Sequence, residues 1–219
     1  MQALRDFGAF QWYVIPFLAI VLFIYGNEIK KARDRQDWGP VFAGLALFGM
    51  DIINETVNAY IEFFTQPQAP LWSTVGPTAY RILVGWNIEI AFMFSIAGII
   101  FANFLSLDKY DTIDLKYFQL PNRWVNAVIF SAFCVFVELI LNAGGYLVWT
   151  YPFWNANLVG IWPIFFLGYF HFFVVAFLVH DMESVKNKAL AVGIIYAIGL
   201  TALLLGVFVL PGITGVSWI

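Results

Sequence analysis

Six long apolar segments divide this sequence, and each is long enough to cross a lipid bilayer as a helix. A transmembrane helix needs about 20 predominantly apolar residues. Hydrophobic residues make up 62% of the chain and charged residues 11%, whereas a soluble domain carries about 25% charged residues. We therefore predict an all-α, polytopic membrane helix bundle with six transmembrane helices, in which residues 1–219 form a single integral-membrane domain. The segments lie at 11–27, 39–64, 81–107, 124–149, 158–179 and 189–210.

The basic residues predict the orientation of this bundle. Nine of the 11 Lys and Arg residues lie in alternate connections, at 27–37, 108–123 and 180–188. The other side of the membrane has only Arg5, before the first segment, and Arg81, at the start of the third. Because basic loops stay in the cytoplasm, we expect both termini outside, in a multi-pass protein of the cell membrane or an endomembrane.

The sequence also contains a weak internal repeat, between residues 39–109 and 124–182. Glu55 and Asn58 in the first stretch match Glu138 and Asn142 in the second, and both stretches contain two apolar segments. Two helix pairs related in this way would be parallel repeats.

The segment 39–64 carries polar residues that lipid would not tolerate. Asp51, Glu55 and Asn58 are spaced by four and three residues, so a helix places them on one stripe. An ionisable residue at the bilayer centre costs roughly 2.5 kcal/mol or more. The stripe must therefore face other helices or water.

Two further carboxyl groups lie at a similar depth in other segments. A helical rise of about 1.5 Å per residue places Glu55, Glu89 and Glu138 roughly 10–16 Å below the same membrane surface. His171 falls near the midplane, within reach of Asp51 or Glu138. We expect the three glutamates to converge on one pocket.

These polar groups suggest a site for acid and base chemistry. A carboxyl group without a basic partner keeps its proton in an apolar environment, and it can then act as a general acid. The Asn residues have a second interpretation, because amides also hold membrane helices together. Trp residues near the helix ends indicate an aromatic belt, or a lid of aromatic faces over the pocket. The expected catalytic residues are Asp51, Glu55, Glu89 and Glu138. The expected substrate-binding residues are Asn54, Asn58, Asn87, Asn142, Trp86 and His171.

The run Asp51-Ile52-Ile53-Asn54-Glu55, which follows a basic connection, resembles a motif of the fungal integral-membrane terpene cyclases. In that family an Asn-x-x-Trp-Glu motif lies on the second helix, and its glutamate is thought to protonate an epoxide or alkene. Asp51 takes the Asn position, Asn54 takes the Trp position, and Glu55 matches the glutamate. The resemblance implies that Glu55 is the acid that starts cyclisation. It departs from the family in the last segment, which holds no acidic residue.

Several functions fit these features. The first is an integral membrane enzyme that uses intramembrane carboxylic acids on a lipophilic, isoprenoid-like substrate, as a cyclase, isomerase or hydratase. The alternatives are a noncatalytic subunit of a membrane protein complex and a proton- or cation-coupled transporter. A single nearby His and the lack of a Glu-x-x-His motif argue against an iron or manganese site, so we expect neither metal nor cofactor.

The same considerations define the expected partners. They are the lipid bilayer, a lipophilic small-molecule substrate and other membrane proteins. A net charge of -3 gives no reason to expect nucleic acid. The single cysteine, Cys134, is expected to be a core residue and has no partner for an internal disulfide.

Overall fold

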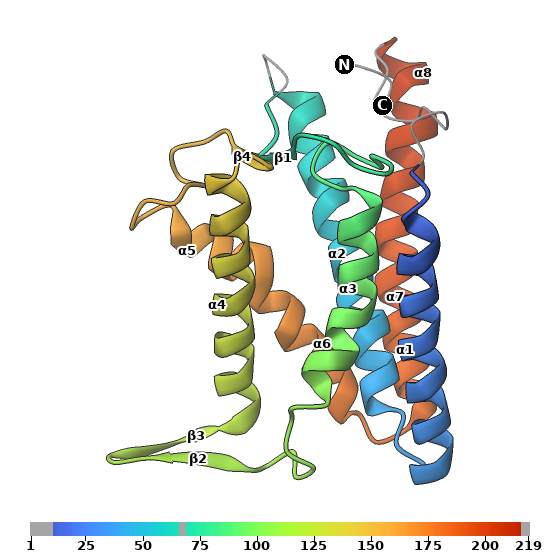
Figure 1. The fold of residues 1–219 in the computed structure, drawn as a ribbon, viewed down its shortest axis with the longest axis vertical. Coiled ribbons are helices and arrows are strands. Elements are labelled where there is room, and N and C mark those ends of the chain that lie inside the picture. Colours follow the sequence, from blue (N-terminus) through green and yellow to red (C-terminus); the bar gives the residue numbers. More distant parts are fainter. Residues whose placement is uncertain (1–10, 66–68, 216–219) are drawn as a thin grey trace.

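The computed structural model describes residues 11–65 and 69–215, which form a helix bundle with a short two-stranded sheet near each end (Figure 1). The helices are α1 (Val14–Arg35), α2 (Gly39–Phe64), α3 (Ile88–Ala102), α4 (Asn122–Ala143), α5 (Ile161–Pro163), η2 (Ile164–Phe170), α6 (His171–Asp181), α7 (Val185–Leu204), η3 (Leu205–Val209) and α8 (Leu210–Thr214). The strands are β1 (Trp72–Thr74), β2 (Thr112–Leu115), β3 (Phe118–Pro121) and β4 (Leu147–Trp149). Because η2 and η3 are π-helical turns between α-helices, α5–η2–α6 and α7–η3–α8 are two long helical segments.

Four helical segments in the described part of the chain are long and apolar enough to cross a membrane: α2, α4, α5–η2–α6 and α7–η3–α8. Helix α3 is apolar but has only 15 residues. The second half of α1 carries several charged residues, among them Glu28 and Lys30. The prediction of a multi-pass, all-helical membrane bundle is thus confirmed, whereas the number of six crossings stays a prediction.

The two ends of the bundle differ. At the upper end of Figure 1, α1 begins, α8 ends, and strands β1 and β4 pair; at the lower end lies the β2–β3 hairpin. We use "upper end" and "lower end" in this sense. Which end faces the cytoplasm stays a prediction, and Arg5, on which that prediction partly rests, lies outside the described residues.

Helix α2 is the central helix, packed against α1, α3, α6 and α7. Small residues allow α2 to approach α3 closely. A Cβ atom on Gly98 of α3 would lie 2.6 Å from the Ala43 carbonyl oxygen and 2.7 Å from the Gly44 Cα. Small residues at such crossings let membrane helices pack backbone to backbone. Helix α2 is therefore firmly fixed, and with it the polar stripe found in the sequence.

Helix α4 stands apart from α2 and α3 and packs mainly against η2 and α6 (Figure 1). Its lower end is tied by Arg123, which binds Asp181 of α6 through two hydrogen bonds of 2.8 and 2.9 Å and donates to the Ser106 carbonyl at 2.9 Å. Its upper end leads into β4, which pairs antiparallel with β1. Helix α4 is thus anchored at both ends and separated from α3 in the middle.

The sequence placed two helix boundaries wrongly. The segment expected at 81–107 is helical only over α3, because the Asn87 side chain caps that helix by accepting a hydrogen bond from the Ile90 amide at 2.9 Å. The segment expected at 124–149 ends its helix at Ala143, and its last residues form β4 instead.

Candidate functional site

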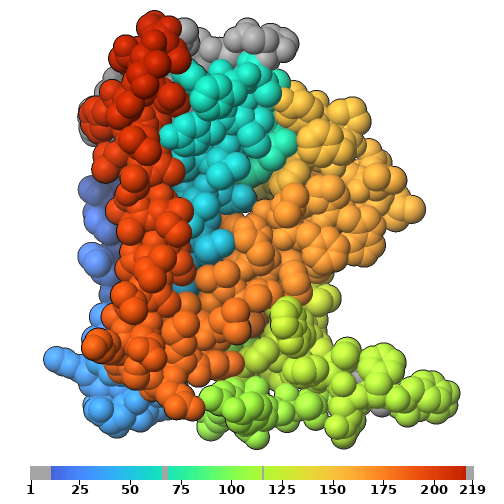
Figure 2. Space-filling view, turned by 180° about the vertical axis from the view of Figure 1, so that it is seen from behind, coloured from blue at the N-terminus to red at the C-terminus, as the bar shows by residue number. Residues whose placement is uncertain are grey.

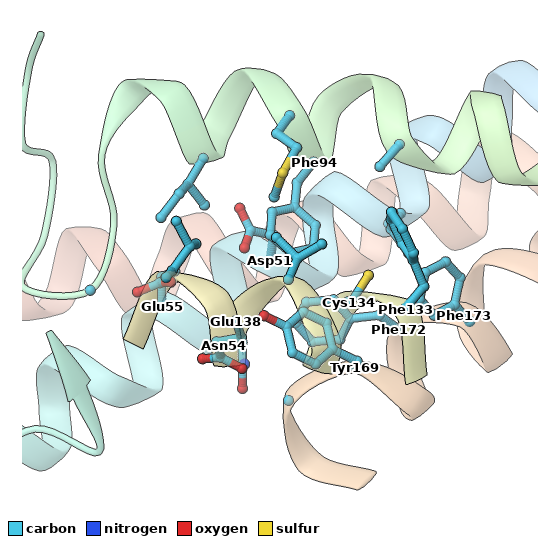
Figure 3. Close-up of a pocket in the computed structure, with 18 of the residues that line it drawn as sticks. Asp51, Asn54, Glu55, Phe94, Phe133, Cys134, Glu138, Tyr169, Phe172 and Phe173 are labelled. Carbon is cyan, nitrogen blue, oxygen red and sulfur yellow. The ribbon is translucent and has the colours of Figure 1, made fainter. Parts of the chain in front are cut away.

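A cavity of about 380 Å³ lies between α2, α3, α4 and the η2–α6 segment, within the size range of small-molecule sites. Most of its wall is apolar. Polar groups gather toward one end, whereas Phe133, Phe172 and Phe173 lie at the other (Figure 3). The polar lining residues labelled in Figure 3 are Asp51, Asn54, Glu55, Glu138 and Tyr169.

Glu55 enters the cavity from α2 and is 5% exposed. The Trp72 indole N–H donates to its Oε1 at 3.0 Å, whereas Oε2 has no hydrogen-bond partner. Gly85 leaves room for this carboxyl, because a Cβ atom there would lie 2.6 Å from Glu55 Oε2. One oxygen of Glu55 is therefore fixed by the protein, and the other is free for a ligand.

Glu138 enters the cavity from α4 in a similar way and is 7% exposed. The Trp149 indole N–H donates to its Oε1 at 3.3 Å, and Oε2 again has no partner of good geometry. The Tyr169 hydroxyl lies close enough to interact electrostatically with this carboxyl. Glu138 therefore also has an oxygen without a hydrogen-bond partner of good geometry at the cavity.

The β1–β4 sheet connects the two tryptophans. Trp72 and Trp149 are directly paired across it, and the Thr150 amide extends the pairing by donating to the Leu71 carbonyl at 3.2 Å. One small sheet thus supplies the hydrogen-bond donors for two glutamates on different helices.

Two amides hold the ends of this sheet to the helices. Asn58 accepts from the Leu71 amide at 2.8 Å and donates to the Trp72 carbonyl at 2.8 Å. Asn142 donates to the Leu147 carbonyl at 2.9 Å. Both Asn residues therefore hold the strands, as the structural interpretation of the amides suggested, and the Asn58 side chain also lies close enough to interact with the Glu55 carboxyl.

Two more polar residues of α2 line the cavity. Asp51 lies one helical turn from Glu55, is 2% exposed, and has an Oδ2 atom without a hydrogen-bond partner. Asn54 lies between them in sequence and also borders the cavity. The structure thus brings together Asp51, Asn54, Glu55 and Glu138, as expected.

The aromatic residues at the upper end cover this polar region. Trp72 stacks on Trp154 with ring centroids 5.3 Å apart, and both line the cavity. The indole N–H of Trp154 is buried without a hydrogen-bond partner. This arrangement agrees with the lid of aromatic faces rather than with a simple interfacial belt.

Glu89 does not join the other glutamates, so the expected convergence of all three was wrong. It lies in the first turn of α3, because that helix begins only at Ile88. Its carboxylate accepts hydrogen bonds from the Tyr13 hydroxyl at 2.8 Å, the Thr78 hydroxyl at 2.6 Å and the Ala79 amide at 2.7 Å. Glu89 is thus fully engaged in joining α1, α3 and the preceding loop.

Three expected binding residues also lie outside the cavity lining. Asn87 caps α3. Trp86 packs against Phe48, with ring centroids 6.2 Å apart. The Nδ1 atom of His171 lies 3.0 Å from the Phe166 carbonyl oxygen of the same helical segment, and His171 is not among the residues that line the cavity.

Sequence reasoning missed other residues of this site. Tyr169 and Gly85 were not among the candidates, and Trp149 was expected only in the aromatic belt or lid, together with Trp72, Trp154 and Trp162. Cys134 lines the cavity although it was expected in the core. A usable signal was present, because each glutamate of the repeat is followed by an Asn and then by a Trp in the next strand. Among the described residues, no group of three or more His, Cys, Asp or Glu side chains could hold a metal ion.

Fold and site together define an integral membrane helix bundle with a mostly apolar internal cavity and carboxyl groups at one end of it. The model of an uncharacterized membrane protein family matches residues 1–208, and the chain belongs to this family. It is similar to an "Uncharacterized protein" of Archaeoglobus fulgidus, with 45% identity over 189 residues, which cover 86% of this chain and 84% of that protein. No solved structure matches the chain.

These comparisons correct one prediction. The resemblance to fungal integral-membrane terpene cyclases was wrong, because the family assignment covers most of the chain and shows no likeness to those enzymes. The shared spacing of Asp51, Asn54 and Glu55 is explained by the helix: it places three polar groups on the cavity wall of α2.

Proposed function

We propose that this protein is a membrane enzyme in which Glu55 and Glu138 act as an acid–base pair on a lipophilic substrate. The observation that carries the proposal is the matched state of the two carboxyls. Each has one oxygen held by a tryptophan indole and one oxygen without a partner, and both line the same cavity. Fixed carboxyls at the polar end of an apolar cavity are suited to proton transfer.

The chemistry balances without a cofactor. One glutamate, as the acid, donates a proton to the substrate, and the other, as the carboxylate, removes a proton from a second atom of the substrate. The net result is a rearrangement of the substrate. Asp51, which neighbours Glu55 on the cavity wall, gives the site a third carboxyl through which the protons can return to their starting positions.

A partnerless carboxyl oxygen has an alternative explanation in helix packing, and the surroundings of these two argue against it. Structural polar groups in membrane proteins are satisfied by neighbouring parts of the protein, as the three hydrogen bonds to Glu89 from the α1 N-cap and the loop before α3 illustrate. Glu55 and Glu138 are instead each left with an unsatisfied oxygen, which normally costs about 1–3 kcal/mol. A ligand that binds these oxygens would offset this cost.

The test begins with lipids that remain bound to the purified protein. Wild type, Glu55→Gln and Glu138→Gln are purified in mild detergent, and their extracted lipids are compared by liquid chromatography and mass spectrometry. The Gln variants keep the size of the side chain but lose the exchangeable acid proton, so they should retain substrate where wild type holds product. Lipid from Glu55→Gln, added to wild type, should be converted at least about 100-fold faster than by the variant itself.

Glu62→Gln is the matched control, because Glu62 is a buried carboxyl of the same helix that does not line the cavity. It should convert the lipid at the wild-type rate. If the two cavity variants also do so, or if wild type leaves every extracted lipid unchanged, the acid–base proposal is wrong.

A further inference from the structure

The cavity is open on one side, between α3 and α4. Four apolar residues border the cavity and are also exposed on the surface: Met93 (47%) and Ile100 (42%) on α3, and Phe133 (54%) and Leu141 (38%) on α4. These helices stand apart at this level (Figure 1). An apolar surface in the membrane-spanning part of a bundle faces hydrocarbon, so this opening leads into the bilayer and not into water.

Three other sides of the cavity are covered by the protein. The β1–β4 sheet and the stacked pair of Trp72 and Trp154 cover its upper end. Phe101 stacks on Phe130, with ring centroids 4.5 Å apart, and joins α3 to α4 toward the lower end. The buried helix α2 forms the wall opposite the opening.

The polar end of the cavity restricts the chemistry of a ligand. The lining includes three carboxyls and no Lys, Arg or His side chain among the described residues. Among the residues that line the cavity, four buried polar atoms have no hydrogen-bond partner: the carboxyl oxygens Asp51 Oδ2, Glu55 Oε2 and Glu138 Oε2, and one donor, the Trp154 indole N–H. A negatively charged head group would find no compensating charge, and burial of an unpaired anion is strongly unfavourable. A head group that donates hydrogen bonds would satisfy these oxygens.

We propose that the occupant is a bilayer amphiphile with a hydroxyl or amine head group, and that it enters sideways between α3 and α4. Its head reaches Glu55 and Glu138, and its hydrocarbon chain runs past Phe133 and Met93 into the lipid. This inference names the substrate class of the proposed enzyme and rests on the same cavity, but binding through the opening does not depend on turnover.

Photo-cross-linking tests the route and the head group together. The full-length protein is reconstituted into phosphatidylcholine nanodiscs with long-chain probes that carry a diazirine in the alkyl chain. Three probes share the chain and differ in the head: primary alcohol, primary amine and carboxylate. After irradiation, peptide mass spectrometry should find alcohol or amine adducts on the α3 and α4 residues that border the opening. The carboxylate should label them less, by about tenfold or more.

Variants at the rim separate the opening from general lipid contact. Met93→Trp and Leu141→Trp place a larger side chain at the opening, and both positions are already partly exposed, so the fold should be kept. Each should reduce labelling inside the cavity, at Cys134, several-fold. Ile194→Trp on α7 is the control, because Ile194 is 51% exposed and does not line the cavity. Helix α7 runs along one edge of the molecule (Figure 2), and this variant should leave labelling unchanged.

The outcomes distinguish this inference from the enzyme proposal. Glu55→Gln should still be labelled, since its amide accepts a hydrogen bond from a hydroxyl, while losing turnover. Labelling confined to lipid-facing residues such as those of α7, or equal cavity labelling by all three head groups, would overturn the inference. Labelling that follows the predicted pattern without turnover in wild type would instead remove only the catalytic role.

Discussion

The α2–β1 arm and the α4–β4 arm of this protein are built alike and supported very differently. Each consists of a helix with a glutamate, an amide one turn further on, and a short strand whose tryptophan binds the glutamate. In α2, however, 61% of the apolar stretch is buried, against 22% in α4. The first arm is embedded in the bundle, and the second faces lipid.

The hydrogen bonds within the α2–β1 arm are also more numerous and shorter than those within the α4–β4 arm. Asn58 is fully buried and binds both a donor and an acceptor of β1, whereas Asn142 makes a single bond to β4. The indole–carboxylate distance is 3.0 Å at Glu55 and 3.3 Å at Glu138. From this contrast we expect the Glu55 side chain to keep its position when a ligand binds, whereas α4 and its Glu138 side chain can move to accommodate the ligand. We still propose that the arms descend from the repeat at 39–109 and 124–182.

The largest difference in stability between the two arms should appear when Asn58 and Asn142 are replaced. Asn58→Ala leaves the Leu71 amide and the Trp72 carbonyl without partners, and should lower the free energy of unfolding by about 3 kcal/mol. Asn142→Ala removes one bond and should cost about 1 kcal/mol. Thermal unfolding in detergent, followed by tryptophan fluorescence, measures both. Equal losses would show that the arms are supported equally.

The second largest effect on stability should come from Arg123, which anchors the lower end of α4. Arg123→Gln breaks the paired contact with Asp181 and should cost about 2 kcal/mol, since hydrogen bonds to charged groups are worth about 1.5–3 kcal/mol. Lys109→Gln is the control. Its partner Glu183 is 91% exposed, and exposed ion pairs contribute about 0–1 kcal/mol. An unchanged unfolding temperature in Arg123→Gln would mean that α4 needs no lower anchor.

Two glycines at the cavity wall test how tightly each side is packed. A Cβ atom at Gly85 would collide with Trp72 and Glu55, so Gly85→Ala should cost about 1–2 kcal/mol through overpacking. At Gly168, beside the α4 arm, the nearest atom is Ile164 Cγ2 at an ordinary 3.7 Å. Gly168→Ala should therefore leave the unfolding temperature unchanged or slightly raised. The reverse order would contradict the view that the α2 side is the rigid one.

The smallest effect should distinguish the two tryptophans. Trp72→Phe should cost about 1.5 kcal/mol and Trp149→Phe about 1 kcal/mol, because each loses one bond to a carboxyl. Double-mutant cycles that combine these variants with Glu55→Gln and Glu138→Gln measure the interaction free energy of each Trp–Glu pair. We expect the interaction free energy of Trp72 with Glu55 to be larger than that of Trp149 with Glu138. The opposite order would contradict the view that the α2–β1 arm is the more firmly held.

The sequence predicted the bundle well because long apolar segments have few alternatives in lipid. It also found Asp51, Asn54, Glu55 and Glu138, since polar groups inside such segments must face inward. It failed for Glu89 because α3 is apolar all round, so neither its start nor its rotation could be read from a stripe. The repeat offered a signal for Trp72 and Trp149 individually, but their pairing could not be predicted, because they meet only through a sheet between loops far apart in the chain.

The local character of the two indole–carboxylate bonds has a consequence for biogenesis. Glu55 and Trp72 are 17 residues apart in the sequence, and Glu138 and Trp149 are 11 residues apart. Each carboxyl therefore forms its hydrogen bond within its own helix–strand arm. A polar residue that is already paired is easier to transfer from the translocon into lipid. Each half can therefore be inserted as it is synthesised, and the pairing of β1 with β4 becomes a later step of assembly within the bilayer.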